Sequence, residues 1–125
     1  QASIAKKLGN SPEAMKTFKD VAESFKNSGF MSRYAMSLAN LGLLHIERGE
    51  YDKALENLLE GLQAASSSGA MLYELFNLIG LLRLSKESSK HTLNPSYLQR
   101  AAKIANILRN HKLELMVQQY AEKDV

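Results

Sequence analysis

The chain of 125 residues contains no cysteine, which excludes a disulfide framework, a thiolate metal site and a cysteine nucleophile. This absence fits a reducing compartment, and we expect a cytoplasmic protein. No apolar run approaches the ~18 residues of a membrane-spanning helix, so we expect no membrane contact. The first residues have no signal-peptide character, and we expect a fragment or processed form whose upstream part is missing.

Motifs that carry catalytic chemistry are also absent. The sequence has no Gly-rich phosphate loop, no Gly-x-Ser-x-Gly turn and no pair of acids placed for a plausible cleft. Its three histidines, His45, His91 and His111, lack the spacing of metal ligands. We therefore expect no enzyme, no metal and no cofactor, and we expect His45 to pack inside the fold.

Neither sign of charge is in large excess, and the formal net charge is +3. Residues 88–113 hold no acid but contain Lys90, Arg100, Lys103, Arg109 and Lys112. Such a stretch can contact an acidic partner or a nucleic acid. However, helical spacing spreads these charges and few aromatic residues lie among them, so we interpret them as a solvated face and expect no nucleic-acid partner.

The pattern that is present is helical, since apolar residues recur at helical spacing and no strand-like alternation occurs. Ser11-Pro12 and Asn94-Pro95 combine an N-cap residue with proline at the start of a helix, while glycines end several stripes. The sequence therefore predicts an all-α fold, with the end of a helix at 1–8 and helices over 12–27, 31–48, 51–67, 70–85, 94–110 and 112–123.

Several residues recur at a distance of 40, which we call the repeat period. The pairs are Gly9/Gly49, Ala14/Ala54 and Gly29/Gly69. A fixed period of this size indicates a stack of repeated units. Each unit here is expected to have an A helix, a tight turn, a B helix and a short return. The period slips to 38 between Gly42 and Gly80 and stretches to 43 by Pro95, so we expect an irregular third unit with a long loop over 85–94.

The segment Leu38-x-x-Leu41-Gly42-x-x-His45-x-x-x-Gly49-x-Tyr51-x-x-Ala54-x-x-x-Leu58 resembles the signature of the tetratricopeptide (TPR) repeat. Leu41, Gly42, Gly49, Tyr51 and Ala54 match that signature, and Ile79-Gly80-Leu81-Leu82 echoes its first part. The resemblance implies a right-handed superhelix of stacked antiparallel helix pairs. Its units would be a partial repeat at 1–29, a TPR at 31–69, a degenerate TPR at 70–110 and a terminal helix at 112–125.

The repeat period is similar to that of the TPR domains of Gram-positive peptide-pheromone receptors and of eukaryotic scaffolds that bind helical or extended peptides. In those relatives an Asn just before the Leu-Gly pair of helix A contacts the backbone of the ligand, and the resemblance assigns this role to Asn40. Asn77 lies one residue from the matching position in the next unit. If Leu41 and Gly42 face helix B, the groove of the A helices is lined by Arg33, Met36, Asn40, Leu43, Glu47, Glu74, Asn77 and Leu81, with Tyr73 beside them.

These features predict a non-catalytic module that binds a peptide or protein segment in the groove of the A helices. The resemblance implies the sensor part of a bacterial regulator of transcription. An alternative is a scaffold or homo-oligomer that associates through apolar helix faces. We expect the apolar helix 72–84 to lie in the core, and any part of it left uncovered would be such a face. A clamp for a C-terminal carboxylate is not expected, because no lysine occurs from 27 to 52.

Overall fold

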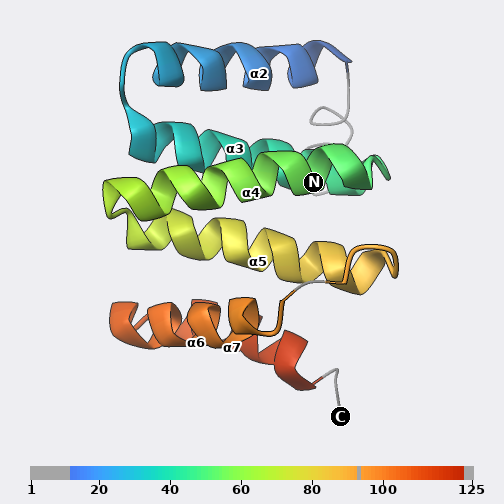
Figure 1. Ribbon diagram of the computed structural model, residues 1–125, viewed down its shortest axis with the longest axis vertical. Helices are drawn as coiled ribbons and strands as arrows, with labels where there is room; N and C mark the ends of the chain where they lie inside the picture. Colours follow the sequence, from blue (N-terminus) through green and yellow to red (C-terminus); the bar gives the residue numbers. More distant parts are fainter. Residues whose placement is uncertain (1–11, 93, 123–125) are drawn as a thin grey trace.

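The computed structural model describes residues 12–92 and 94–122, and every regular element in them is an α-helix. The predicted all-α class is therefore confirmed. The helices lie across the molecule and follow one another from α2 at one end to α6 and α7 at the other (Figure 1). They are α2 (Pro12–Asn27), α3 (Met31–Glu47), α4 (Tyr51–Ser68), α5 (Met71–Glu87), α6 (Ser96–Leu108) and α7 (His111–Glu122). The helical end expected at 1–8 and the N-cap Ser11 lie outside the described residues.

Among the residues that the structure describes, four at helix ends have left-handed backbone. Gly29, Gly49 and Gly69 have φ angles of 79°, 75° and 71°, which glycine adopts without steric cost. The fourth is Arg109, with a φ angle of 54° at the C-cap of α6. Arg109 stands one repeat period after Gly69, so the third unit keeps the turn conformation although its glycine is replaced.

The spacing of the helices corrects the predicted irregularity. Helices α3, α5 and α7 begin at Met31, Met71 and His111, so each start follows the previous one by one full repeat period. The spacing of 38 between Gly42 and Gly80 is therefore not the offset between successive units, and that prediction is wrong. The predicted loop over 85–94 also begins too early, because α5 continues to Glu87 and α6 begins at Ser96. The longer loop is compensated by a shorter α6, of 13 residues against 18 in α4.

Each helix packs mainly on its neighbours in the sequence, and the odd-numbered helices also contact one another. Helix α4 packs against α3 and α5, α6 packs against α5 and α7, and α3 and α7 both contact α5. Buried side chains form three adjoining clusters, one over α2, α3 and α4, one over α3, α4 and α5, and one over α5, α6 and α7. The core therefore continues along the whole stack.

Leu58 of α4 shows why small residues occur on the odd helices. Its side chain is fully buried, which stabilises the fold by roughly 1.5–3 kcal/mol. A Cβ atom added at Gly42 of α3 would stand 2.5 Å from Cγ of Leu58, and one at Gly80 of α5 would stand 2.6 Å from its Cδ2. Both glycines therefore allow α3 and α5 to close on the same leucine. None of the helices described is long and apolar enough to cross a membrane.

Candidate binding surface

All five residues predicted on α3 lie along one uncovered stripe of that helix. Arg33, Asn40 and Glu47 are exposed, while Met36 and Leu43 are half-buried. Their spacing of three and four positions keeps them on one side of an α-helix. The residues between them, Leu38 and Leu41 among them, are buried against neighbouring helices. Within residues 12–92 and 94–122, this side of α3 is thus left open.

Asn40 occupies the middle of the stripe. Within the part of the chain that the structure describes, its exposed side-chain amide has no hydrogen-bond partner. An amide offers two N–H donors and a carbonyl acceptor, so it can pair with a peptide bond whatever side chains the peptide carries. Asn40 therefore has both the exposure and the chemistry that the predicted role requires.

The three residues predicted on α5 do not line this surface. Asn77 is fully buried, and its Nδ2 donates hydrogen bonds to the carbonyl oxygens of Ala35 and Tyr73 at 3.1 and 2.8 Å. Leu81 is fully buried in the cluster shared by α3, α4 and α5. Glu74 is buried on the side that faces α6. These assignments followed the spacing of 38 between the Leu-Gly pairs, which gives α5 the wrong helical phase.

Moving one repeat period along the chain from the α3 stripe finds the partly exposed positions of α5, except that Gly80, the counterpart of Asn40, is buried against Leu58. Met36 and Leu43 correspond to Phe76 and Arg83, which are both half-buried. Tyr73, the counterpart of Arg33, is also half-buried, and its ring centroid lies 6.1 Å from that of Phe76. We call the combined set the α3–α5 surface; its members are Arg33, Met36, Asn40, Leu43, Glu47, Tyr73, Phe76, Arg83 and Glu87.

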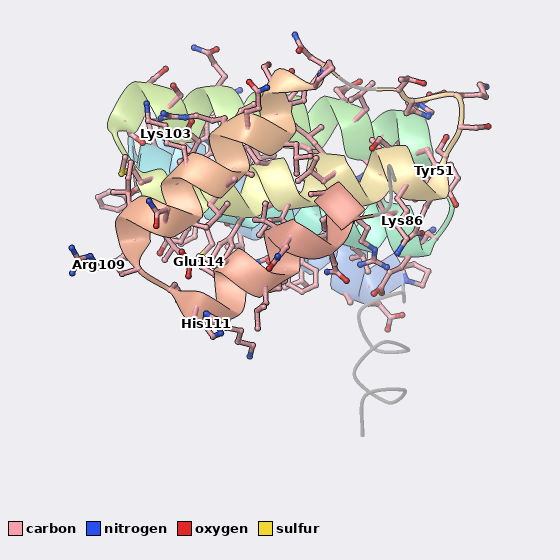
Figure 2. All side chains as sticks on the ribbon, turned by 90° about the horizontal axis from the view of Figure 1, so that it is seen from below. Tyr51, Lys86, Lys103, Arg109, His111 and Glu114 are labelled. Atoms are coloured by element: carbon pink, nitrogen blue, oxygen red, sulfur yellow. The ribbon has the colours of Figure 1, made fainter. Side chains whose placement is uncertain are left out.

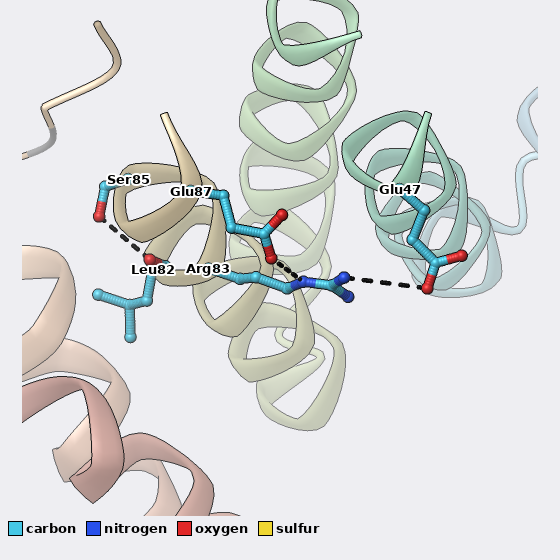
Figure 3. A network of polar contacts seen from close by, with 5 residues as sticks. All are labelled: Glu47, Leu82, Arg83, Ser85 and Glu87. Atoms are coloured by element: carbon cyan, nitrogen blue, oxygen red, sulfur yellow. Dashed lines mark hydrogen bonds and ion pairs between the residues drawn. The ribbon is translucent and has the colours of Figure 1, made fainter. Parts of the chain in front are cut away.

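Charged residues gather where α3 and α5 end. Arg83 donates from Nε to Oε2 of Glu87 at 2.8 Å, and its Nη2 lies 3.9 Å from Oε2 of Glu47 (Figure 3). Burial lowers the pKa of Arg83, but the hydrogen bond to Glu87 and the two carboxylate charges outweigh it and raise the pKa overall. Arg83 therefore remains charged and ties α5 to α3 at this end of the surface.

The α3–α5 surface has most of its large apolar side chains towards the starts of the two helices and an ion-pair network at their ends, with Arg33 and Leu43 as exceptions. Met36, Tyr73 and Phe76 lie in the first halves of their helices, and the charged network lies at the ends. The two helices run in the same direction, since Asn77 meets Ala35 while Arg83 faces Glu47. Apolar anchors beside a few polar groups are typical of peptide-binding surfaces.

The basic residues noted in the sequence do not converge. Figure 2 shows Lys103, Arg109 and His111 at separate points around the end formed by α6 and α7. Arg100 instead donates from Nε and Nη2 to the two carboxylate oxygens of Glu74, at 2.8 and 3.2 Å. This hydrogen bonding raises the pKa of Arg100. In the described residues, no three His, Cys, Asp or Glu side chains group as metal ligands would.

Comparisons with known proteins give no match, whether to protein-family models, to curated proteins or to solved structures.

Proposed function

We propose that the chain is a non-catalytic module that binds an extended or helical peptide segment on the α3–α5 surface. The observation that carries this proposal is the exposed, unpaired amide of Asn40 between half-buried Met36 and Leu43. Apolar anchors would supply affinity, and the amide would fix the ligand's backbone. The charged ends at Glu47 and Arg83 would set its orientation.

The proposal includes a TPR-like right-handed superhelix. The regular interval between the starts of α3, α5 and α7 supports it, as does the close packing of Gly42 and Gly80 on Leu58. The resemblance to peptide-pheromone receptors extends the proposal to the sensor part of a cytoplasmic bacterial regulator. A helix-turn-helix domain elsewhere in the same polypeptide would support that extension.

The test is a selection of peptides followed by substitution of Asn40. Short peptides would be selected from a displayed random library against the wild-type protein, and their affinities measured by fluorescence anisotropy. Asn40→Ala should weaken binding at least tenfold, since about 1.4 kcal/mol of amide pairing to the ligand backbone is lost. Circular dichroism would check that the variant keeps its fold.

Asn106→Ala is the matched control, because Asn106 is an exposed asparagine on α6, away from the α3–α5 surface. Its peptide affinities should equal those of the wild type. Peptides that bind Asn40→Ala and wild type equally well would remove Asn40 from the site. If Phe76→Ala also leaves the affinities of these peptides unchanged, they do not bind at the α3–α5 surface.

The alternative function is self-association through apolar faces. It is favoured by Ile107 and Leu115 near the α6–α7 end, which are 49% and 52% exposed. Large exposed apolar side chains on neighbouring helices often mark an association surface. Light scattering over a range of concentrations would show a dimer if this function holds.

A further inference from the structure

The three turns that join α2 to α3, α4 to α5 and α6 to α7 follow one another along one edge of the stack, at the left of Figure 1. We call this edge the turn edge; it consists of residues 26–33, 66–73 and 106–113, which are one repeat period apart. None of these segments contains an aspartate or a glutamate. Their lysines and arginines are Lys26, Arg33, Arg109 and Lys112. The formal charges of the turn edge are therefore all positive.

The opposite edge of the stack has a different balance of charge. Residues 47–53 and 86–92 hold four acids and four lysines or arginines, so their formal charges cancel. Figure 2 shows the separation of the two edges, with Arg109 on one side and Tyr51 and Lys86 on the other. Neither edge of a second copy would complement the turn edge, because the opposite edge has no net charge and another turn edge would repel it.

Large apolar side chains are exposed at all three turns. Phe30 and Met31 are 55% and 37% exposed, and Leu72 and Ile107 are 39% and 49% exposed. Single exposed apolar residues are ordinary on protein surfaces, but here they occur at every turn of an edge that carries only cations. Proteins that lie on an anionic bilayer combine these two kinds of side chain, because apolar groups enter the interface while lysine and arginine meet the lipid headgroups.

The backbone at Arg109 is a second and independent observation. Its φ angle of 54° is of the kind that Gly29 and Gly69 adopt in the other two turns, and it is unfavourable for a residue with a Cβ atom. Within residues 12–92 and 94–122, no carboxylate forms an ion pair with Arg109. A charged side chain that occupies a strained position without a partner in the fold indicates a role outside the fold.

We propose that the turn edge binds the surface of an anionic lipid bilayer. Its exposed apolar side chains enter the headgroup region, and Arg109 and Lys112 contact the lipid phosphates. A bilayer presents phosphates and acyl chains at every point, so three separate turns can bind it at once. Duplex nucleic acid would match only the cations, because its phosphates offer the apolar side chains no partner.

This attachment goes beyond peptide binding at the α3–α5 surface and does not depend on it. It also needs no helix that crosses the bilayer. The expectation of no membrane contact was based on the lack of such a helix, so it does not bear on contact with the membrane surface.

Further helices stacked in the same order would not cover the turn edge. Helices α3, α5 and α7 begin at this edge, and α2, α4 and α6 end at it. A helix packed beyond α2 or α7 would therefore extend the stack at its ends. It would place its own turn along the same edge and leave the three existing turns exposed.

The first test is co-sedimentation of the protein with lipid vesicles. The wild type should bind vesicles of equal parts phosphatidylcholine and phosphatidylglycerol at least tenfold more tightly than vesicles of phosphatidylcholine alone. Arg109→Glu/Lys112→Glu should weaken binding to the mixed vesicles at least tenfold, since each cation near the surface contributes roughly fivefold. Lys53→Glu/Lys90→Glu makes the same change in net charge on the opposite edge and should bind nearly as well as the wild type.

Arg109→Gly separates binding from folding. It should weaken binding to the mixed vesicles roughly fivefold, because one cation is lost. The same change removes the unfavourable left-handed conformation of a residue with a Cβ atom, so the variant should be more stable than the wild type. Weaker binding by a more stable protein cannot result from unfolding.

A tryptophan probe tests whether the apolar side chains enter the bilayer. The chain contains no tryptophan, so a single one reports only on its own surroundings. With mixed vesicles, the emission of Phe30→Trp should shift to shorter wavelength and should be quenched by brominated acyl chains. Leu59→Trp is the matched control, because Leu59 is an exposed apolar residue in the middle of α4, and it should show neither change.

Four results would overturn the proposal. They are the absence of binding to mixed vesicles, equally tight binding to phosphatidylcholine alone, an equal loss of binding in the two double variants, and an unquenched Phe30→Trp in vesicle-bound protein. If duplex DNA is bound instead, and Arg109→Glu/Lys112→Glu abolishes that binding, the turn edge is a nucleic-acid site. None of these variants changes a member of the α3–α5 surface, so failure here is distinguishable from failure of peptide binding.

Discussion

At the scale of single residues, Arg109 has a left-handed backbone conformation that favours glycine. Its left-handed conformation costs a residue with a Cβ roughly 1–2 kcal/mol, and Gly69 takes the same position one unit earlier without that cost. Arg109→Gly should raise the free energy of unfolding by about 0.5–1 kcal/mol, after the entropy of glycine in the unfolded chain is subtracted. Urea denaturation would measure the change.

Gly69→Ala is the reciprocal variant. It should lower the free energy of unfolding by about 1 kcal/mol, although space around Gly69 is open and no clash occurs. Equal stability of Arg109→Gly and the wild type would mean that the turn at 109 is not held in the left-handed region.

Glu50 gives a residue-scale prediction about pH. Its Oε1 lies 2.8 Å from Nδ1 of buried His45 and 3.3 Å from Nε of Arg48. The hydrogen bond with His45, and to a smaller extent the charge of Arg48, lowers the pKa of Glu50 below its ordinary value of 4.5. Because the folded-state pKa is depressed, this stabilisation is complete above pH 4.5 and is lost as pH falls through the lowered pKa.

The measurement is a thermal unfolding series from pH 7 to pH 3 for the wild type and Glu50→Gln. At pH 7 the wild type should be more stable by about 0.5–1 kcal/mol, a figure that allows for solvent screening of a partly exposed pair. The two proteins should converge as the pH falls below the ordinary pKa of 4.5. A difference that stays constant down to pH 3 would show that the charge of Glu50 contributes nothing.

At the scale of elements, the contact between α4 and α5 depends on one glycine and one asparagine. A Cβ at Gly61 would stand 2.7 Å from Cγ of Asn77 and closer still to its Oδ1, which has no hydrogen-bond partner among the described residues. Asn77 is itself held by its two bonds to Ala35 and Tyr73. Gly61→Ala should therefore destabilise by about 1–3 kcal/mol, although alanine is the better helix former.

A double-variant cycle checks this contact. Asn77→Ala alone should also destabilise, because it removes the two buried hydrogen bonds that Nδ2 donates to the carbonyls of Ala35 and Tyr73. In the double variant the new Cβ has room. The double variant should therefore lose about 1 kcal/mol less in free energy of unfolding than the two single variants lose together, which is on the order of typical contact couplings. Strict additivity in urea denaturation would show that α4 and α5 separate to absorb the methyl group.

At the scale of the whole molecule, the sequence predicted the helix positions well and identified the exposed side of α3, but not that of α5. Capping residues and glycines mark the helix ends, and each predicted boundary for α3 and α4 lies within a residue of the structure. The residues on α3 were found because periodicity separates its open side from Leu38 and Leu41. Those on α5 were missed because α5 is buried nearly all round, so its apolar residues do not indicate which side is exposed. The similarity between the two Leu-Gly segments then indicated the wrong side.

The burial of Glu74 and Asn77 could not be predicted from residue type, because both are polar side chains that hydrogen-bond inside the fold, Glu74 to Arg100 and Asn77 through Nδ2 to two backbone carbonyls. The spacing of 40 between Gly29 and Gly69 indicates which residues of α5 correspond to those of α3. Adding it to positions 33, 36 and 43 gives 73, 76 and 83.

The neighbour-to-neighbour packing of the helices also determines how firmly each is held against local opening. Helix α5 contacts α3, α4, α6 and α7, whereas α2 packs chiefly on α3. In an array of this kind, the cost of releasing a helix is approximately the sum of its own stability and its interfaces. Amide protons should therefore be most protected from exchange with solvent in α3, α4 and α5 and least protected in the outer helices α2 and α7. The centre of the chain acts as a stiff support, from which the outer helices can detach without loss of the remaining fold.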